Sequence, residues 1–588
     1  MDEFKKEKGR LMKVDFDDNF GYKYAIWFDY TRNLMMDLRV GTLLAIPNFS
    51  HYKEEEHLSI VSIANVMPFH YAAGSEMLGY PTFEDQVRQE AFLDFYNQAD
   101  KSVEETTKIQ IIATPTGLEL NKQTGQLKFR SGEETQIPMY GGEVAILGND
   151  LITQIFNGNL LDNECIEIGK LTRGNIEIKA KVEDLIRTHI GIFGYTGMGK
   201  SNLSSTLIAK ILKEYDRPVK IVVFDLMGEY FALLADILLE TDGCLGFLEV
   251  ASLTKEVKSF MEGKGDKDKA AISIVGSLQI PSSLNSPEMK KKYIEIVKKL
   301  LSKGKIKVRY ETFKKLGDFI FKVESNARDS GELQTLNSEI WEKFSNEEFN
   351  EDNIRKLEVF LKGKNLTTLG AGVRKRDLLN ALEKLDESFE PIKEHKLEVY
   401  SGSKSLVNDL LHNNKSGLYI IESESVDEIR TFSKEIICGG YSIYNERRKN
   451  GYDHTSNPLI LFYFDEADEF IPQEPQGSYK DSSIAVETIA RRGRKFGLGV
   501  CIATQRVTYL NTNIMAQPHT YFISKLPRKS DRERVIEAFG ISDEMLRETF
   551  KFRKGDWLLI SHDATGMKSV PIPIHTDNAE DRIRKNLE

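Results

Sequence analysis

The first third of the chain consists of short runs in which apolar and polar residues alternate. Such runs occupy residues 22–30, 39–48, 57–67, 108–114 and 166–182, and Gly, Pro and Asn separate them. Alternation is typical of strands with one buried face, and several short strands at this spacing favour a small β-barrel or a sandwich. The pattern therefore predicts an N-terminal β domain over residues 1–183.

Residues 83–108 break this pattern. Phe, Val, Ala and Leu recur there at helical spacing among acidic and polar residues. An apolar stripe with this period is typical of an amphipathic helix. The segment therefore predicts a helix inserted between strands of the β domain.

From residue 188 the chain alternates single strands with helices. An apolar run at 189–193 precedes a helical stripe at 201–215, in which Leu203, Leu207 and Ile211 share one face. Further apolar runs occupy residues 219–225, 417–421, 458–464, 498–504 and 520–523. Strands that alternate with helices indicate a parallel α/β sheet, which we assign to residues 184–228 and 416–588.

Residues 229–415 interrupt the α/β pattern. This segment is rich in Lys and Glu, mainly helical in its periodicity, and too long for a loop between adjacent strands. It predicts an inserted helical subdomain. Within it, residues 290–322 carry 12 Lys or Arg against three acids, a net charge of +9. Two interpretations stay open for this stretch: a solvated helix face, or a contact with DNA or an acidic partner.

Composition narrows the class of protein. A chain of 588 residues implies several domain-sized units. The net charge of −10 argues against a protein that simply coats nucleic acid, although a ring can be acidic outside and basic in its channel. The apolar runs are much shorter than the roughly 20 residues that span a bilayer. The N-terminus has no apolar signal core, so we expect a cytoplasmic protein with no membrane contact.

The strongest chemical motif is the octet Gly194-Tyr-Thr-Gly-Met-Gly-Lys200-Ser201, which fits the pattern G-x-x-x-x-G-K-[ST] between an apolar run and a helical stripe. In such a loop backbone N–H groups surround phosphates, the lysine reaches the β and γ oxygens, and the serine hydroxyl holds Mg²⁺. The octet therefore predicts a site for ATP and Mg²⁺. The expected nucleotide ligands are Gly194, Gly197, Met198, Gly199, Lys200, Ser201 and Asn202.

Two acids after an apolar run complete the expected site. Asp465 and Glu466 follow the run at 458–464. We expect Asp465 to hold Mg²⁺ together with Ser201, and Glu466 to orient or deprotonate the attacking water. An ordinary helix N-cap is the structural alternative for this pair. Gln505 follows the next run, at 498–504, and is a candidate sensor of the γ-phosphate.

A cluster of cations lies between these acids and Gln505. Residues 489–497 end a predicted helix and contain Arg491 with three further cations. The helix dipole favours cations at this position. Phosphoryl transfer also needs positive charge at the γ-phosphate, which an arginine can supply from a neighbouring subunit. Arg491 is the first candidate for such an arginine finger, and Arg187 is the second.

Together, these residues resemble the HerA family of the HerA/FtsK P-loop ATPases over most of the chain. The resemblance is carried by the octet, by Asp225-Leu-Met-Gly-Glu-Tyr230, by Asp465-Glu-Ala-Asp-Glu-Phe-Ile-Pro472, by the cations at 491–497 and by Thr504-Gln-Arg506. The D-x-x-G-E-Y element discriminates best among P-loop families. The chain departs from the family at Asp468, where His is frequent, and at Val507, where Pro is usual.

The resemblance implies an α/β fold with a RecA-like P-loop ATPase core, an N-terminal β-barrel domain and a helical insertion. It also implies a homohexameric ring that hydrolyses ATP and pulls double-stranded DNA through its pore, working with a separately encoded nuclease or effector subunit in a setting such as bacterial anti-phage defence. Two other classes stay open. One is an ATP-binding ring scaffold that assembles and activates an effector, and the other is a secretion or conjugation ATPase, which would normally carry membrane anchors.

Overall fold

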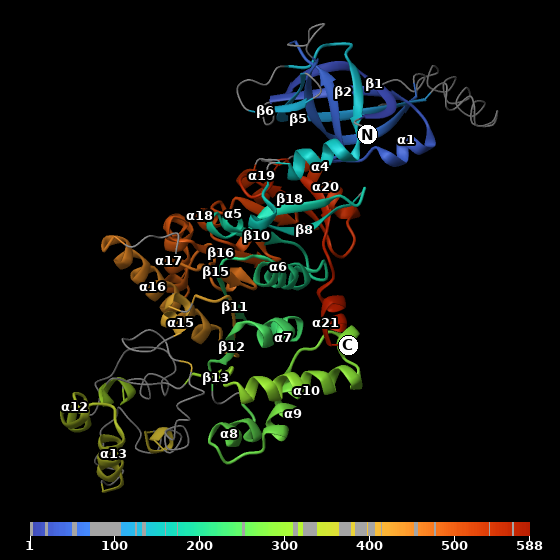
Figure 1. Ribbon diagram of the computed structural model, residues 1–588. Coiled ribbons are helices and arrows are strands. Elements are labelled where there is room, and N and C mark those ends of the chain that lie inside the picture. The colour runs from blue at the N-terminus through green and yellow to red at the C-terminus, as the bar shows by residue number, and fades with distance from the viewer. Residues whose placement is uncertain are drawn as a thin grey trace, which may run out of the picture.

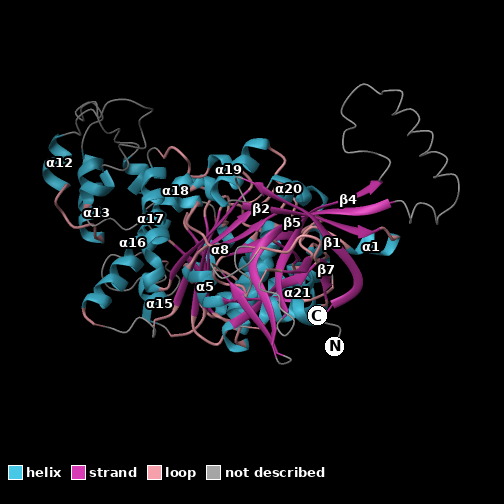
Figure 2. Ribbon diagram, turned by 90° about the horizontal axis from the view of Figure 1, so that it is seen from above, coloured by secondary structure: helices cyan, strands magenta, loops and turns pink. Residues whose placement is uncertain are grey.

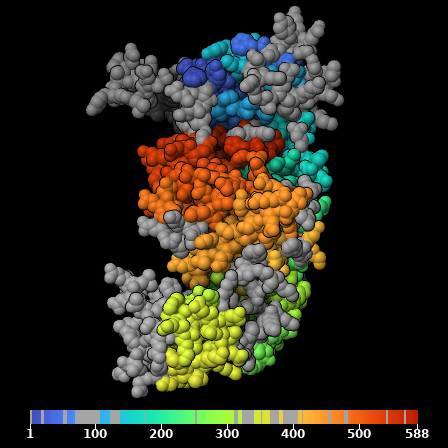
Figure 3. Space-filling model, turned by 90° about the vertical axis from the view of Figure 1, so that its left-hand side faces the viewer, coloured from blue at the N-terminus to red at the C-terminus, as the bar shows by residue number. Residues whose placement is uncertain are grey.

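Three parts of the molecule follow one another along its long axis in the computed structural model (Figure 1). The N-terminal strands lie at one end, a large sheet with its helices lies in the middle, and helices α12 and α13 lie at the other end. Figure 3 shows the same order from another side. The structure describes residues 4–17, 21–49, 56–70, 107–123, 126–131, 137–158, 160–172, 174–249, 253–309, 315–320, 338–363, 378–382, 397, 406–412, 414–451, 457–475, 478–539, 541, 543–566 and 570–587.

The N-terminal strands close into a barrel. They pair in the order β2-β1-β7-β3-β4-β5-β6, and β5 also pairs with β2, so six strands form a ring from which β6 extends. Alternate residues of β5 point inward, since Ile109, Ile111 and Ala113 are buried. The structure thus decides for a barrel over a sandwich. The bounds are β1 Phe4–Asp17, β2 Gly21–Asp29, β3 Leu43–Pro47, β4 Glu56–His70, β5 Thr107–Gln123, β6 Gln126–Ser131 and β7 Glu143–Leu147, with helices α1 Arg32–Asp37 and α4 Asn149–Asn157.

The last alternating run is not part of the barrel. Strands β8 (Cys165–Leu171) and β9 (Glu177–Lys181) form a hairpin in the second sheet, where β8 pairs with β19 (Ile572–His575). The expectation that residues 166–182 add strands to the barrel was wrong, because alternation identifies a half-buried strand but not the sheet that it joins. The helix expected at 83–108 falls outside the described residues, except for the last two positions, which begin β5.

The second sheet has 12 strands in the order β13-β12-β14-β11-β15-β16-β10-β17-β18-β19-β8-β9. From β13 to β17 all neighbours are parallel, which confirms the predicted α/β core. All residues of β11, β15 and β16 are buried, and this explains their nearly continuous apolar sequence. The bounds are β10 Ile190–Phe193, β11 Val219–Asp225, β12 Asp242–Phe247, β13 Ile306–Val308, β14 Gly417–Glu422, β15 Leu459–Phe464, β16 Leu498–Thr504, β17 Thr520–Ile523 and β18 Asp556–Ser561.

Helices cover both faces of this sheet. One face shares a core with α5 Val182–Arg187, α6 Lys200–Glu214, α7 Tyr230–Glu240, α8 Lys255–Met261, α9 Lys267–Ser277, α10 Pro287–Ser302 and α21 Ala579–Leu587. The other face packs against α15 Leu406–His412, α16 Val426–Lys449, α17 Ser478–Arg492, α18 Thr512–Met515, α19 Lys529–Phe539 and α20 Asp543–Glu548. Figure 2 shows α15, α16 and α17 together on the side away from α1. Within the described ranges, no helix combines the length and the apolar character needed to cross a membrane.

The segment 229–415 is only partly a separate helical body. Its first part adds β12 and β13 to the sheet, and α10 buries Tyr293 in the sheet core while Lys290 and Lys291 face solvent. Helices α12 (Ser338–Phe344) and α13 (Glu351–Gly363) belong to a small core of their own. The two added strands were missed because β12 (DGCLGF) contains two glycines and only a few apolar residues, while β13 is short and lies among lysines. The domain boundaries stay a prediction.

Gly499 on β16 tests how closely α5 packs against the sheet. A Cβ added at this position would lie 1.9 Å from the carbonyl oxygen of Ile186, so the backbones must move apart. We expect Gly499→Ala to lower the free energy of unfolding by about 2 kcal/mol or more, measured by chemical denaturation. The control is Gly276→Ala on α9, where nothing lies within 4 Å of the added Cβ and alanine favours the helix. Equal stability of the two variants would contradict the close packing.

Candidate nucleotide-binding site

The carboxyl ends of four adjacent parallel strands meet at one edge of the second sheet. These strands are β11, β15, β16 and β10, in that order. The octet follows β10 and leads into α6. Gly197 (φ 83°) and Gly199 (φ 98°) have left-handed backbones, which residues with a Cβ disfavour. Backbone conformation therefore requires glycine at both positions.

A cavity of ≈ 490 Å³ lies over this edge. The predicted residues that line it are Gly197, Gly199, Lys200, Ser201, Asn202, Asp465, Glu466 and Gln505. Gly194 and Met198 do not line it. A Cβ on Gly194 would lie 3.2 Å from the Ser524 side chain, and Met198 is buried, with its carbonyl accepting a 3.1 Å hydrogen bond from the Gly555 N–H. These two residues shape the loop and not the surface of the cavity.

Glu466 joins the loop after β15 to the loops after β10 and β16. Its Oε1 lies 4.0 Å from Lys200 Nζ and accepts a 3.3 Å hydrogen bond from Gln505 Nε2. The side-chain oxygen of Gln505 accepts in turn from the Thr196 hydroxyl. Glu466 also has a left-handed backbone, with φ 45°, which is costly for a residue with a Cβ and is typical of functional sites. One polar network therefore connects the three loops.

The two acids after β15 both lie in surroundings that disfavour negative charge. Burial raises the pKa of the Glu466 carboxyl, and nearby Lys200 opposes the rise. A carboxylate with a raised pKa is a better proton acceptor at neutral pH. Burial, and then the neighbouring Asp225 and Glu466, raise the pKa of Asp465 well above its usual value. A divalent cation would relieve this repulsion, and Asp465 and Ser201 offer the oxygen ligands that Mg²⁺ prefers.

The loop after β11 brings a further acid, Glu229, to the cavity. The Asp225 carboxylate accepts hydrogen bonds of 2.8 to 3.4 Å from the backbone N–H groups of residues 227–230. This turn directs Glu229 toward Ser201, whose hydroxyl donates to Glu229 Oε2 at 2.8 Å. The sequence interpretation used the D-x-x-G-E-Y element only for the family resemblance. An acid that closely follows a second strand of a parallel sheet is the signal that could have identified Glu229.

A row of buried hydroxyls supports Asp465 from behind. The Tyr230 hydroxyl donates to Asp465 Oδ1 at 3.4 Å and lies 2.5 Å from the Tyr463 hydroxyl. The Tyr463 hydroxyl in turn lies 2.8 Å from Ser204 Oγ. These side chains come from α7, β15 and α6, so three elements fix the position of one carboxylate.

Segments far away in the sequence form the remaining walls. They are Gln279, Ile280 and Pro281, between α9 and α10, and Lys554 and Glu580 in the C-terminal region. Asn202 also contacts this region, because its side-chain amide donates to the Asp577 carbonyl at 2.9 Å and accepts from the Ala579 N–H at 2.7 Å. Asn202, expected as a nucleotide ligand, thus also anchors the start of α21. No local motif marks these walls.

The two candidate arginine fingers lie at the opposite edge of the sheet. Arg187 ends α5 just before β10, and Arg491 lies in the last turn of α17 before β16. The seven residues of β16 span roughly 20 Å, so Arg491 is remote from the cavity of its own chain. Arg187 donates to Glu183 at 2.8 Å and to the Arg494 carbonyl at 2.7 Å. Arg491 is 53% exposed and pairs with Glu487 at 2.9 Å, so it is the better placed to reach another chain.

The chain is similar to known HerA helicases over about three quarters of its length. The family model "Helicase HerA, central domain" matches residues 166–433. The DNA double-strand break repair helicase HerA of Pyrococcus furiosus is 23% identical over 451 residues, covering 74% of this chain and 74% of that protein. The protein of the same name from Sulfolobus acidocaldarius is 22% identical over 454 residues, covering 76% and 75%. Among solved structures, VirB4 of Thermoanaerobacter pseudethanolicus aligns with a TM-score of 0.35 at 11% identity, over 72% of this chain and 99% of that one.

Glu229→Ala tests whether this acid orients the Ser201 hydroxyl. We expect the variant to fold but to need about tenfold more Mg²⁺ for nucleotide binding, because the hydroxyl loses its acceptor. Glu229→Gln should recover most of the loss, since its amide oxygen still accepts. Titration of Mg²⁺ against a fluorescent ATP analogue measures the effect, and Glu240→Ala at the end of the same helix is the control. An unchanged Mg²⁺ requirement in Glu229→Ala would remove Glu229 from the site.

Proposed function

Because this chain belongs to the HerA family, we propose that it hydrolyses ATP to move double-stranded DNA. The relatives are DNA repair helicases by name, and this is the source of the proposed movement of DNA. The proposed hydrolysis of ATP rests on the polar network at the strand ends. Lys200, Glu466 and Gln505 come from three separate loops, yet they line one cavity. Glu466 contacts both of the others, Lys200 at 4.0 Å and Gln505 at 3.3 Å.

The proposal gives each of these side chains a separate task. Lys200 and the octet backbone hold the phosphates. Ser201 and Asp465 hold Mg²⁺, which neutralises charge on the phosphate oxygens when it is bound. Glu466 accepts a proton from the attacking water and orients it. Gln505 contacts the γ-phosphate or that water, and its hydrogen bond to Glu466 ties the loop after β16 to the reaction.

A homohexameric ring fits the position of Arg491. The cavity and this arginine lie at opposite edges of one sheet, so Arg491 can complete a nucleotide site only when copies pack head to tail. A ring also accommodates the net charge of −10, because positive loops around a channel act locally on DNA. We further propose that a separately encoded nuclease or effector subunit acts on the DNA that the ring moves, as the family resemblance implies, within an anti-phage defence system.

Hydrolysis with and without double-stranded DNA is the experiment that tests the function. We expect linear duplex DNA to stimulate hydrolysis and the wild-type ring to displace a third strand bound to that duplex. Glu466→Gln should still bind Mg-ATP but lose about 100-fold or more in turnover, because the water loses its base. Glu474→Gln, an exposed acid on the same loop, is the control. If duplex DNA does not change the rate of ATP hydrolysis and the third strand is not displaced, the result would favour the ring scaffold instead.

Arg491→Ala tests the contribution of a neighbouring chain. We expect normal ATP binding but about 1,000-fold slower hydrolysis in the assembled ring, because the γ-phosphate loses positive charge in the transition state. Rings mixed from Arg491→Ala and Lys200→Ala chains should regain activity, since one chain supplies the octet and the other the arginine. Arg187→Ala is the comparison, and we expect it to destabilise the fold because the Arg494 carbonyl loses its donor and Glu183 keeps only Arg217 as a partner among the described residues. Failure of mixing to restore hydrolysis would contradict action between chains.

A further inference from the structure

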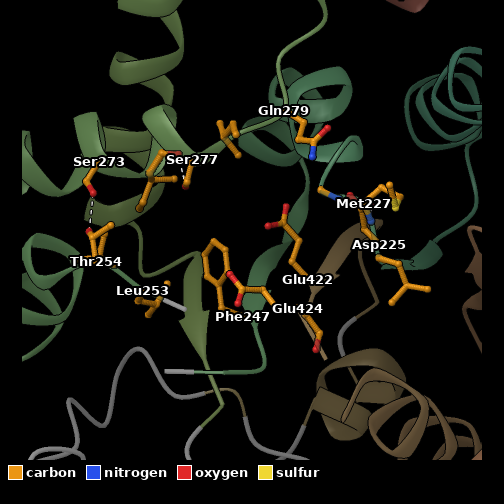
Figure 4. A pocket seen from close by; sticks show the side chains of 16 residues that line it. Asp225, Met227, Phe247, Leu253, Thr254, Ser273, Ser277, Gln279, Glu422 and Glu424 are labelled. Carbon is orange, nitrogen blue, oxygen red and sulfur yellow. Dashed lines mark hydrogen bonds between the residues drawn. The ribbon is translucent and has the colours of Figure 1, made fainter. Parts of the chain in front are cut away.

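A second cavity of ≈ 260 Å³ opens beside the nucleotide cavity. It lies at the carboxyl ends of β11, β12 and β14, and residues of α8 and α9 close it from the other side (Figure 4). Met227 and Gln279 line both cavities. These two side chains therefore face both a group bound in the second cavity and the nucleotide cavity. None of the site residues predicted from the sequence lines it.

The walls of this second cavity are of two kinds. The apolar part is formed by Phe247, Leu253, Val257, Ile274 and Leu278. The acidic part is formed by Asp225, Glu422 and Glu424, and no Lys or Arg is among the described residues that line the cavity. An apolar wall with an acidic end suits a guest that has an aliphatic stem and a cationic head.

Most polar groups of the cavity have partners within the chain. The Asp225 carboxylate is occupied by the backbone N–H groups of its own turn. The hydroxyls of Thr254 and Ser273 bond to each other (Figure 4). Glu422 differs, because its Oε1 is shielded from solvent and accepts no hydrogen bond in the described structure. Glu422 lines the cavity and is only half-buried as a residue, so its carboxyl is the group that a guest would satisfy.

The position of Glu422 makes a cationic guest favourable. It ends β14 in register with Asp225 at the end of β11. Burial, and then the neighbouring Asp225, raise the pKa of the Glu422 carboxyl to about 8. A buried carboxylate without a partner is costly, whereas a cation with good geometry offsets that cost. Figure 4 shows the Glu422 side chain directed in among the labelled residues.

Suitable cations lie at the opposite edge of the same sheet. Arg492 ends α17 and Lys495 follows it, and both are exposed. Neither forms an ion pair within the described part of the chain, whereas Arg491 and Arg494 beside them do. In a head-to-tail ring, one surface of each copy meets a different surface of the next. An acidic cavity at one edge and unpaired cations at the other are complementary in charge.

We infer that this second cavity receives the side chain of Arg492 or Lys495 from a neighbouring copy of the chain, with Glu422 as the counter-ion. The inference rests on the ring of the proposed function. It adds a contact between copies that is separate from Arg491 and does not touch the nucleotide. Met227 and Gln279 line both cavities. A side chain that fills the second cavity therefore packs against the same two residues that face the nucleotide cavity.

Glu422→Gln tests this pairing, and Glu424→Gln is the matched control because it removes an exposed acid from the same cavity. Sedimentation velocity of the full chain, with Mg²⁺ and a non-hydrolysable ATP analogue, measures assembly. We expect Glu422→Gln to weaken assembly about tenfold or more without lowering the thermal midpoint of the isolated chain. Glu424→Gln should assemble as the wild type does.

Charge exchange then identifies the partner. Glu422→Lys should prevent assembly, and adding Arg492→Glu or Lys495→Glu to the same chain should restore it. Wild-type assembly by Glu422→Gln would overturn the inference and leave the ring standing, as would failure of both exchanges to restore assembly. A Glu422-dependent site for spermidine on the isolated chain, with assembly unaffected, would also overturn it. A wild-type chain that stays monomeric in all conditions would overturn the ring and the inference together.

Discussion

The Asp225 carboxylate holds the turn on which both cavities depend. It accepts the backbone N–H groups of residues 227–230, and a hydrogen bond to a charged acceptor contributes about 1.5–3 kcal/mol. Burial raises the pKa of Asp225 to about 6, and these hydrogen bonds oppose the rise. The turn then directs Glu229 to Ser201, Tyr230 to Asp465, and Met227 into the wall between the cavities. Losing Asp225 would leave this whole edge without fixed geometry.

Three adjacent strands lead to an acid at their carboxyl ends, where Asp225 and Asp465 are buried and Glu422 is half-buried. The surroundings of the three acids differ. Asp225 on β11 accepts backbone N–H groups. Asp465 after β15 accepts a tyrosine hydroxyl and is the proposed ligand of a divalent cation. The Oε1 atom of Glu422 on β14 accepts no hydrogen bond from the residues that the structure describes. On the proposed function, an edge with so much negative potential can bind a nucleotide only if Lys200 and a divalent cation reverse the local charge. The acidic edge would therefore make nucleotide binding depend strongly on the divalent cation.

Short sequence motifs were enough to locate the parts of the site that follow directly after a strand. The octet, the two acids and Gln505 each follow a buried strand, and parallel strands bring such ends together. Most of the octet, both acids and Gln505 line one cavity, and their chemical roles stay a prediction. Long-range contacts left no such signal. Glu229 depends on a turn held by a side chain, Gln279 comes from an insertion, and residues 166–182 joined a sheet that alternation alone could not identify. Asp468, a departure from the family, accepts a 2.7 Å hydrogen bond from the Thr504 hydroxyl, so it ties the loop after β15 to β16.

His189 connects the start of β10 to the end of α17 and to β16. Its Nε2 donates to the Ala490 carbonyl at 2.9 Å, and its Nδ1 accepts from the Val500 N–H at 3.2 Å, so both ring nitrogens are used. Burial lowers the pKa of His189 to about 4, which keeps the ring neutral, and the two hydrogen bonds select this tautomer. Its backbone is left-handed, with φ 68°, a strained conformation that the two hydrogen bonds help to hold. Only the four residues of β10 separate His189 from the octet, and the Ala490 carbonyl that His189 contacts belongs to the residue before Arg491.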